Sequence, residues 1–291
     1  MSNNKMIIDE RQREIGKFFV GRLLPFRKKR QVGPFTFIDH MGPGKIGPGK
    51  YMGVNQHPHV GLSTLTYLFK GEIEHRDSGG GHALIKPGDV CFMTSGKGIT
   101  HTERTPEHLK DGQEHEFHGY QIWVALPKEL EEMEPRMDFY KANQIPTWEE
   151  NNLRLKLVAG KGFGKESPLK GFTDLFMLDV FVEHDTTLDL TDKLKGELAI
   201  VIVEGSIIDE GEEIKKGQML VSKTNEACCL ELEAGTHLLL FGGEPLPEER
   251  FLMWNFVSSD KKRLAQAKED WKNKRFPMIE GDDSYIPFPE F

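Results

Sequence analysis

Short runs of apolar and β-branched residues, separated by glycine and proline, recur along most of the chain. In the first half such runs occupy residues 18–20, 35–38, 62–69 and 119–126. Runs of this length between turn residues are typical of β-strands. The pattern therefore predicts an all-β first half, with a loop rich in glycine and proline at residues 41–53.

A second series of strand-like runs occupies about residues 153–242. It includes residues 175–182, 198–203 and 236–241, and it is similar in kind to the first series but different in exact sequence. Two such series of short strands favour a duplicated β-barrel. The charged segment 128–152 is interpreted as the connector between the two halves.

One helix is predicted near the end of the chain, over residues 259–275. The apolar positions at helical spacing are Leu264, Ala267 and Trp271. This spacing places them on one face of a helix. Ser258 or Ser259 is the expected N-cap, and Pro277 stops the helix. We expect the helix to pack on the barrels, with Trp271 in the core.

The composition limits the classes of function. A chain of 291 residues suggests two domains, and a net charge of -8 argues against a general nucleic-acid surface but leaves a protein partner open. Three cysteines form a poor disulfide framework, so we expect a reduced, cytoplasmic protein, with the nucleus as an alternative in a eukaryotic cell. No apolar run is long enough to predict a membrane span or a signal peptide.

Two short motifs, His57-Pro-His59 and His101-Thr-Glu103, carry the candidate chemistry. Residues i and i+2 of a strand face the same side, so each motif presents two donors together. Three imidazoles and one carboxylate suit iron, manganese, nickel, copper, cobalt or zinc, and a thiolate-free set with open positions is typical of non-haem iron. The alternative is that these are unrelated surface histidines. Two such pairs make this alternative weaker than a single pair would.

Other polar residues leave alternatives open. His75 and Asp77 form a third i, i+2 pair, which either orients a metal ligand or substrate, or is a structural hydrogen-bonded pair. His184 and His237 are isolated in the second half. The second barrel is therefore expected to lack a metal.

The chain closely resembles the pirin family of the cupin superfamily. The stretches that carry the resemblance are residues 57–71, 75–78, 86–89 and 93–103. The resemblance implies an all-β bicupin, with two tandem jelly-roll-like barrels, short helices and a C-terminal helix. Residues 1–140 would form the N-terminal metal-binding cupin domain, and residues 141–291 the metal-free C-terminal cupin domain with its helix.

The resemblance also implies one divalent transition metal, with Fe²⁺ preferred, bound in the N-terminal barrel by His57, His59, His101 and Glu103. The chain departs from the commoner pirin pattern at Ala125, where asparagine is usual. A second departure is the segment Phe-Leu-Met-Trp-Asn-Phe-Val that follows Arg250.

The implied activity is that of a quercetin 2,3-dioxygenase, with a flavonol and O₂ as substrates. Glu103 would be the catalytic residue that accepts the flavonol hydroxyl proton. The alternative is a non-catalytic, metal-dependent regulatory protein that binds a protein partner and co-regulates transcription or metabolism. A third reading is another cupin chemistry on a small metabolite, because a fold does not fix a substrate.

Overall fold

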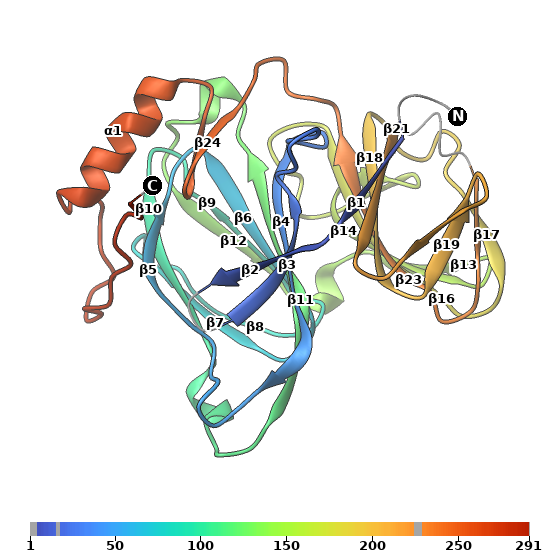
Figure 1. Cartoon of the computed structure of the whole chain (residues 1–291), viewed down its shortest axis with the longest axis horizontal. Helices are drawn as coiled ribbons and strands as arrows, with labels where there is room; N and C mark the ends of the chain where they lie inside the picture. The colour runs from blue at the N-terminus through green and yellow to red at the C-terminus, as the bar shows by residue number, and fades with distance from the viewer. Residues whose placement is uncertain (1–4, 16–17, 224–228, 291) are drawn as a thin grey trace. The chain divides into compact units, whose positions relative to one another are not determined.

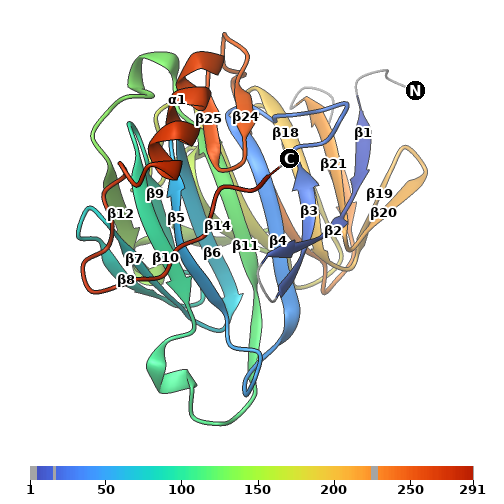
Figure 2. The same ribbon diagram turned by 60° about the vertical axis from the view of Figure 1, so that its left-hand side comes forward.

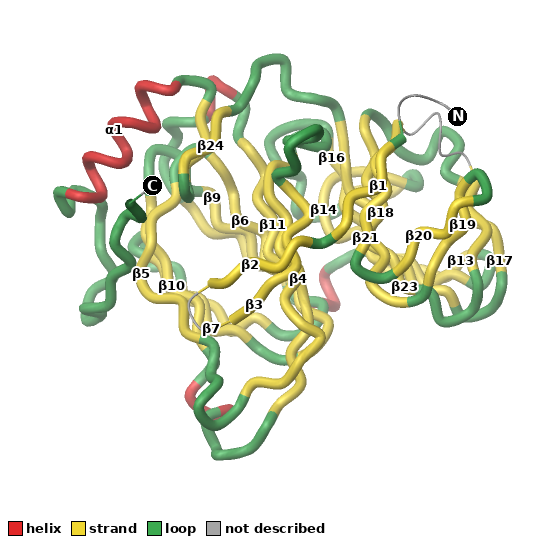
Figure 3. The backbone as a smooth tube through the Cα atoms, viewed as in Figure 1, coloured by secondary structure: helices red, strands yellow, loops and turns green. Residues whose placement is uncertain are grey.

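The computed structural model describes residues 5–15, 18–223 and 229–290, and β-strands dominate them (Figure 3). The all-β prediction is confirmed. The chain forms two compact units: unit 1 contains residues 1–11, 21–37 and 143–246, and unit 2 contains residues 12–20, 38–142 and 247–291.

Unit 2 carries two large antiparallel sheets and, near the C-terminus, a two-stranded one (Figure 1). The four-stranded sheet has the order β5 (Gly53–His59), β10 (Ile99–Arg104), β7 (Ile73–Asp77), β8 (His82–Ile85). The seven-stranded sheet has the order β12 (Arg136–Tyr140), β9 (Val90–Thr94), β6 (Leu62–Lys70), β11 (His115–Ala125), β4 (Phe35–Ile46), β3 (Phe18–Leu24), β2 (Arg11–Ile15). Within β3 and β4 the chain passes from one unit to the other.

Unit 1 also carries two antiparallel sheets. The larger has the order β1 (Met6–Asp9), β21 (Gln218–Lys223), β18 (Glu197–Glu204), β23 (His237–Gly243), β16 (Leu175–Val182), β14 (Leu153–Gly162), β13 (Thr147–Glu150), and β15 (Lys165–Glu166) pairs with β14. The smaller has the order β17 (Thr186–Asp189), β22 (Cys229–Leu232), β19 (Ser206–Asp209), β20 (Glu212–Lys215).

The core of unit 1 is aliphatic. Alternate residues of β14, namely Leu153, Leu155 and Leu157, join alternate residues of β16, β18 and β23 in one buried cluster. Alternation with period two places these side chains on the same face of each strand. The interior of unit 1 is thus filled by leucine, isoleucine and valine, together with Phe176.

Two segments that the sequence predicted as connections contain strands. β4 continues to Ile46 inside the predicted loop 41–53. In the predicted connector 128–152, β12 pairs with β9 and β13 pairs with β14. The unit boundary after residue 142 lies within this connector, but its strands were missed because β12 and β13 are edge strands, where partly exposed charged residues hide the strand pattern.

Among the described residues, short 3₁₀ helices span Glu107–Leu109, Lys128–Leu130 and Ala142–Gln144. The one α-helix that the structure describes, α1, spans Lys261–Lys272, which confirms the predicted helix with shorter bounds. Its N-cap is Asp260, whose carboxylate accepts the N–H two residues on. The serine caps were a wrong prediction, since both hydroxyls donate to Glu131 instead. No helix among the described residues is long and apolar enough to span a membrane.

Helix α1 packs on the hairpin formed by β24 (Phe251–Met253) and β25 (Phe256–Ser258), as Figure 2 shows. The buried cluster beneath it consists of Val60, Phe256, Leu264, Ala267, Trp271, Phe276 and Phe288. Trp271 is fully buried, stacks on Tyr285, and donates its Nε1 hydrogen to the Ile286 carbonyl at 2.9 Å. The prediction that Trp271 belongs to the core is confirmed.

The compact units differ from the linear division at 140/141 at both ends of the chain. Residues 247–291, with helix α1, cluster with unit 2, because α1 packs over Val60. Residues 1–11 cluster with unit 1, because β1 pairs with β21. The break near residue 142 lies close to the predicted one. The linear division therefore remains a proposal.

The burial of Trp271 gives a test of the helix docking. Trp271→Ala should lower the free energy of unfolding by about 3–5 kcal/mol, as for other large core truncations. The control is Glu269→Ala on the exposed face of the same helix, expected to stay within about 0.5 kcal/mol. Urea denaturation measures both variants, and equal small changes would contradict the docking of α1.

Candidate metal centre

Strand β10 lies between β5 and β7, and this order brings the candidate donors together. His101 is the direct partner of His57 on β5, and Ile99 is the partner of His59. On the other side, His101 is the partner of Asp77 on β7. Three sequence motifs that lie far apart along the chain thus become neighbours across one small sheet.

The imidazoles of His57, His59 and His101 form a compact, buried cluster. Their ring centroids lie 4.3 Å apart for His57 and His101, 5.0 Å for His59 and His101, and 5.1 Å for His57 and His59. One nitrogen from each ring lies within 4.8 Å of the other two. Such a cluster can hold a metal ion between the rings.

Backbone carbonyls orient two of these rings. The Nδ1 atom of His57 lies 2.8 Å from the Asn55 carbonyl, and the Nδ1 atom of His59 lies 3.2 Å from the Asn255 carbonyl. A carbonyl oxygen only accepts, so each Nδ1 atom carries the hydrogen. Each Nε2 atom therefore presents a lone pair, as a metal ligand requires.

The residues present fit a divalent metal. The Nε2 atom of His101 is buried and has no hydrogen-bond partner within the described part of the chain, which is costly unless another group satisfies it. Burial lowers the pKa of His57 to about 4 and holds the pKa values of His59 and His101 well below their usual range. All three imidazoles are therefore neutral at pH 7, which is the metal-binding form.

Glu103 belongs to a second donor group, and His101 is the one residue that this group has in common with the histidine cluster. Its carboxylate, His101 and His75 form a second group of donors within 4.8 Å of one another. The pairing of β10 with β5 shifts register between His101 and Glu103, so Glu103 is the partner of Val54 on β5. The structure thus brings the four sequence-predicted residues into two groups joined at His101, and their joint role as ligands remains a proposal.

Two polar residues that the sequence reasoning missed hold the Glu103 carboxylate. Gln121 donates its Nε2 hydrogen to Glu103 Oε1 at 3.0 Å, and the Thr66 hydroxyl lies 3.3 Å from the same oxygen. Thr66 also donates to Gln121 Oε1 at 2.7 Å. Burial raises the pKa of Glu103 and outweighs these bonds. The sequence feature that could have indicated this network is the presence of Thr66 and Gln121, two polar residues within otherwise largely apolar strand runs.

The C-terminal segment supports strand β5 from outside the cluster. Besides the Asn255 carbonyl, Val257 donates its N–H to the Val60 carbonyl at 3.0 Å, and Ile286 donates to the Gln56 carbonyl at 2.9 Å. Asn255 lies in the segment that departs from the commoner pattern. No local sequence signal could have linked it to His59, because they lie about 200 positions apart.

The remaining histidines lie outside both donor groups. His115 contacts Asp111, and His118 lies 2.8 Å from His40 between their Nε2 atoms. His237 of unit 1 pairs with Asp179. Both donor groups found among the described residues belong to unit 2.

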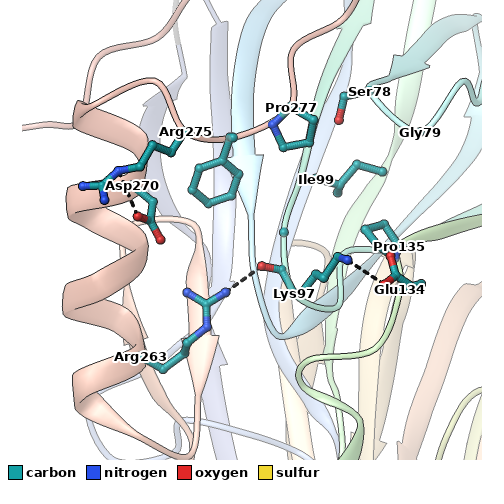
Figure 4. Close-up of a pocket in the computed structure, with 12 residues that line it drawn as sticks. Ser78, Gly79, Lys97, Ile99, Glu134, Pro135, Arg263, Asp270, Arg275 and Pro277 are labelled. Atoms are coloured by element: carbon teal, nitrogen blue, oxygen red, sulfur yellow. Dashed lines mark hydrogen bonds and ion pairs between the residues drawn. The ribbon is translucent and has the colours of Figure 1, made fainter.

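A separate pocket of about 490 Å³ lies between α1 and the turn before β10 (Figure 4). Four of its charged residues pair with one another, Arg275 with Asp270 and Lys97 with Glu134, and Arg263 pairs with Glu132 outside the lining. None of the four proposed ligands lines it, although Ile99 does. The pocket therefore gives no support to the proposed metal site.

Comparison with known proteins identifies the family. The Pirin model matches residues 17–124, and the model of the Pirin C-terminal cupin domain matches residues 177–277. A pirin-like protein of Caulobacter vibrioides is 43% identical over 289 residues, which cover 98% of this chain and 99% of that protein. The chain belongs to the pirin family. The predicted two-cupin fold of this pirin is thereby confirmed.

Two other relatives carry the name of an activity. A Pseudomonas aeruginosa protein provisionally named a quercetin 2,3-dioxygenase is 36% identical, over 88% of this pirin and 80% of that protein. The crystal structure of a quercetin 2,3-dioxygenase from Acinetobacter baumannii superimposes with a TM-score of 0.88 and 31% identity, covering 99% of this pirin and 96% of that chain.

The lowered pKa of His57 gives a pH-dependent stability in the metal-free protein. The unfolded chain, with a pKa of 6.5 at this residue, takes up a proton before the folded chain does. The neutral His57 side chain therefore contributes about 3 kcal/mol to the free energy of unfolding above pH 6.5. This contribution is lost as the pH falls from 6.5 towards 4. Urea denaturation at pH 7 and 4.5 measures the loss.

His57→Gln lacks this titration, so its unfolding free energy should fall less between the two pH values. His82→Gln, at an exposed histidine, should keep the wild-type dependence. Identical pH dependence for wild type and His57→Gln would refute the assignment.

Proposed function

We propose that this pirin binds one divalent transition metal, with iron(II) preferred, through His57, His59, His101 and Glu103. The observation that carries the proposal is the buried cluster of three neutral imidazoles joined at His101 to a buried carboxylate. Imidazole and carboxylate donors without thiolate suit iron(II) and its neighbours among the transition metals.

We further propose that the protein is a cytoplasmic quercetin 2,3-dioxygenase that uses a flavonol and O₂. The names of its relatives support this substrate class. The bound metal would supply Lewis-acid stabilisation of the anionic flavonol oxygen. Glu103 accepts the hydroxyl proton, because burial raises the proton affinity of its carboxylate. Gln121 and Thr66 hold Oε1 of that carboxylate in place.

A regulatory protein that binds a protein partner is the second candidate. Its support is that the Caulobacter vibrioides relative, which matches 98% of this chain, is named pirin-like. The same metal centre would then serve a conformational role. Turnover of a flavonol by the wild-type protein distinguishes the two functions.

The metal and the activity are tested together. Purified wild-type protein should contain one metal ion per chain and consume quercetin in air but not anaerobically. His101→Ala should lose both metal and turnover, because it removes the donor shared by the two groups. The control, His82→Ala, removes an exposed histidine paired with Glu74 and should change neither. Elemental analysis and loss of quercetin absorbance are the readouts; bound metal without turnover would favour the regulatory function.

The role of Glu103 as a base is tested by Glu103→Gln. The amide keeps the size of the side chain but cannot accept the hydroxyl proton. Turnover should fall about 10²–10⁴-fold, the usual contribution of a general base. Metal content is measured on the same sample, and activity per bound metal is compared with wild type. Unchanged activity per metal ion would exclude Glu103 as the proton acceptor.

A further inference from the structure

His101 differs from the other two clustered histidines in what its Nδ1 atom faces. The Nδ1 atoms of His57 and His59 face backbone carbonyls, whereas that of His101 lies 3.4 Å from the Nδ1 atom of His75. The Nε2 atom of His75 lies 3.2 Å from Asp77 Oδ2. Asp77, His75 and His101 thus form a buried row that ends at the proposed metal site.

Asp77 is fixed at the far end of this row. Its Oδ1 atom accepts the N–H groups of Gly79 at 2.8 Å and Gly81 at 2.9 Å. A Cβ atom at Gly81 would lie 2.2 Å from Asp77 Oδ2, so glycine is needed for the turn to approach this closely. Burial alone would raise the pKa of Asp77, but the bonds from His75 and the two amides outweigh it and lower the pKa. The group is an ionised acceptor at neutral pH.

The carboxylate at one end of the row and the proposed metal at the other determine where the hydrogens lie. A carboxylate only accepts, so the Nε2 atom of His75 carries a hydrogen. A metal at His101 Nε2 needs the lone pair of that atom, so the hydrogen of His101 lies on Nδ1 and points to the Nδ1 atom of His75, which accepts it. The lone pair of His101 then lies on Nε2, the buried atom without a hydrogen-bond partner among the described residues.

We propose that Asp77 and His75 are positioning residues that fix the tautomer and orientation of His101, so that its Nε2 atom binds the metal. This inference rests on the proposed metal site. It deepens that proposal by assigning to two side chains the role that backbone carbonyls play for His57 and His59. Outer hydrogen-bond partners of metal-bound histidines commonly act in this way.

The tautomers can be measured without any metal. Long-range proton–nitrogen NMR correlations on the ¹⁵N-labelled, metal-free protein distinguish Nδ1–H from Nε2–H in each ring. We expect Nδ1–H at His101 and Nε2–H at His75. A hydrogen on His101 Nε2, or two hydrogens on His75, would overturn the proposal. This result is independent of whether the wild-type protein binds metal, so failure of the proposed function is recognised separately.

Asp77→Asn should reverse the direction of the hydrogen bonds along the row. The amide oxygen takes over the bonds from Gly79 and Gly81, and the amide nitrogen then donates to His75 Nε2. His75 must then donate to His101 Nδ1, which moves the hydrogen of His101 to Nε2. Metal affinity should fall about 10–100-fold, the usual effect of losing such a partner, and the NMR signature of His101 should invert.

The matched control is Glu74→Gln on the same strand. Glu74 contacts the exposed His82 at 2.8 Å, outside the buried row, so this variant should keep both the wild-type affinity and the wild-type tautomer. Calorimetric titration with Fe²⁺ or Co²⁺ measures the affinities. Wild-type affinity in Asp77→Asn would overturn the proposal, even if the variant is less stable.

A direct ligand role for His75 is the competing explanation, because His75, His101 and Glu103 also form a donor group. X-ray absorption spectroscopy of the Co²⁺-loaded protein counts the bound imidazoles. His75→Gln should leave that number unchanged at reduced affinity. Loss of one imidazole in this variant would show that His75 binds the metal and would overturn its positioning role.

Discussion

The register of β10 between β5 and β7 is the constraint on which the proposed site depends. It sets His101 opposite His57 on one side and opposite Asp77 on the other. A slip of one residue would turn every donor of β10 to the opposite face of the sheet. The i, i+2 spacing places two donors of each motif on the same face of a strand, and the register then aligns the donors of neighbouring strands. The same register aligns Glu103 with His75 and so builds the second donor group.

The two barrels differ in whether their interiors contain polar groups, which cost free energy to bury. Unit 1 fills its interior cluster with apolar side chains that have no polar atoms to satisfy. Unit 2 buries histidines and a carboxylate, and each such group costs free energy unless it is paired. The Asn55 and Asn255 carbonyls, Gln121 and Asp77 are the partners that reduce this cost. Most of these partners orient a donor as well as satisfying it, so they also shape the site.

The sequence predicted the parts of this arrangement that depend on local pattern. The all-β class, the helix stripe ending at Trp271 and the pairs at His57 and His101 follow from periodicity alone, and the family resemblance added the two-cupin fold. The helix cap at Asp260 was missed because neighbouring serines were equally good candidates. Gln121 lay inside a predicted strand, but its bond to Glu103 joins β11 of one sheet to β10 of the other, and no local pattern specifies that contact.

The same distinction applies to the C-terminal segment, whose neighbours in unit 2 are not given by its position in the chain. Its hairpin carries the Asn255 carbonyl to His59, and its helix buries Trp271 over Val60. A donor strand whose inner face carries imidazoles cannot also anchor itself by inward apolar packing. Backbone bonds hold β5 and the residue after it: Ile286 donates to the Gln56 carbonyl and Val257 donates to the Val60 carbonyl. The strand that carries His57 and His59 is thus held by residues about 200 positions later in the chain.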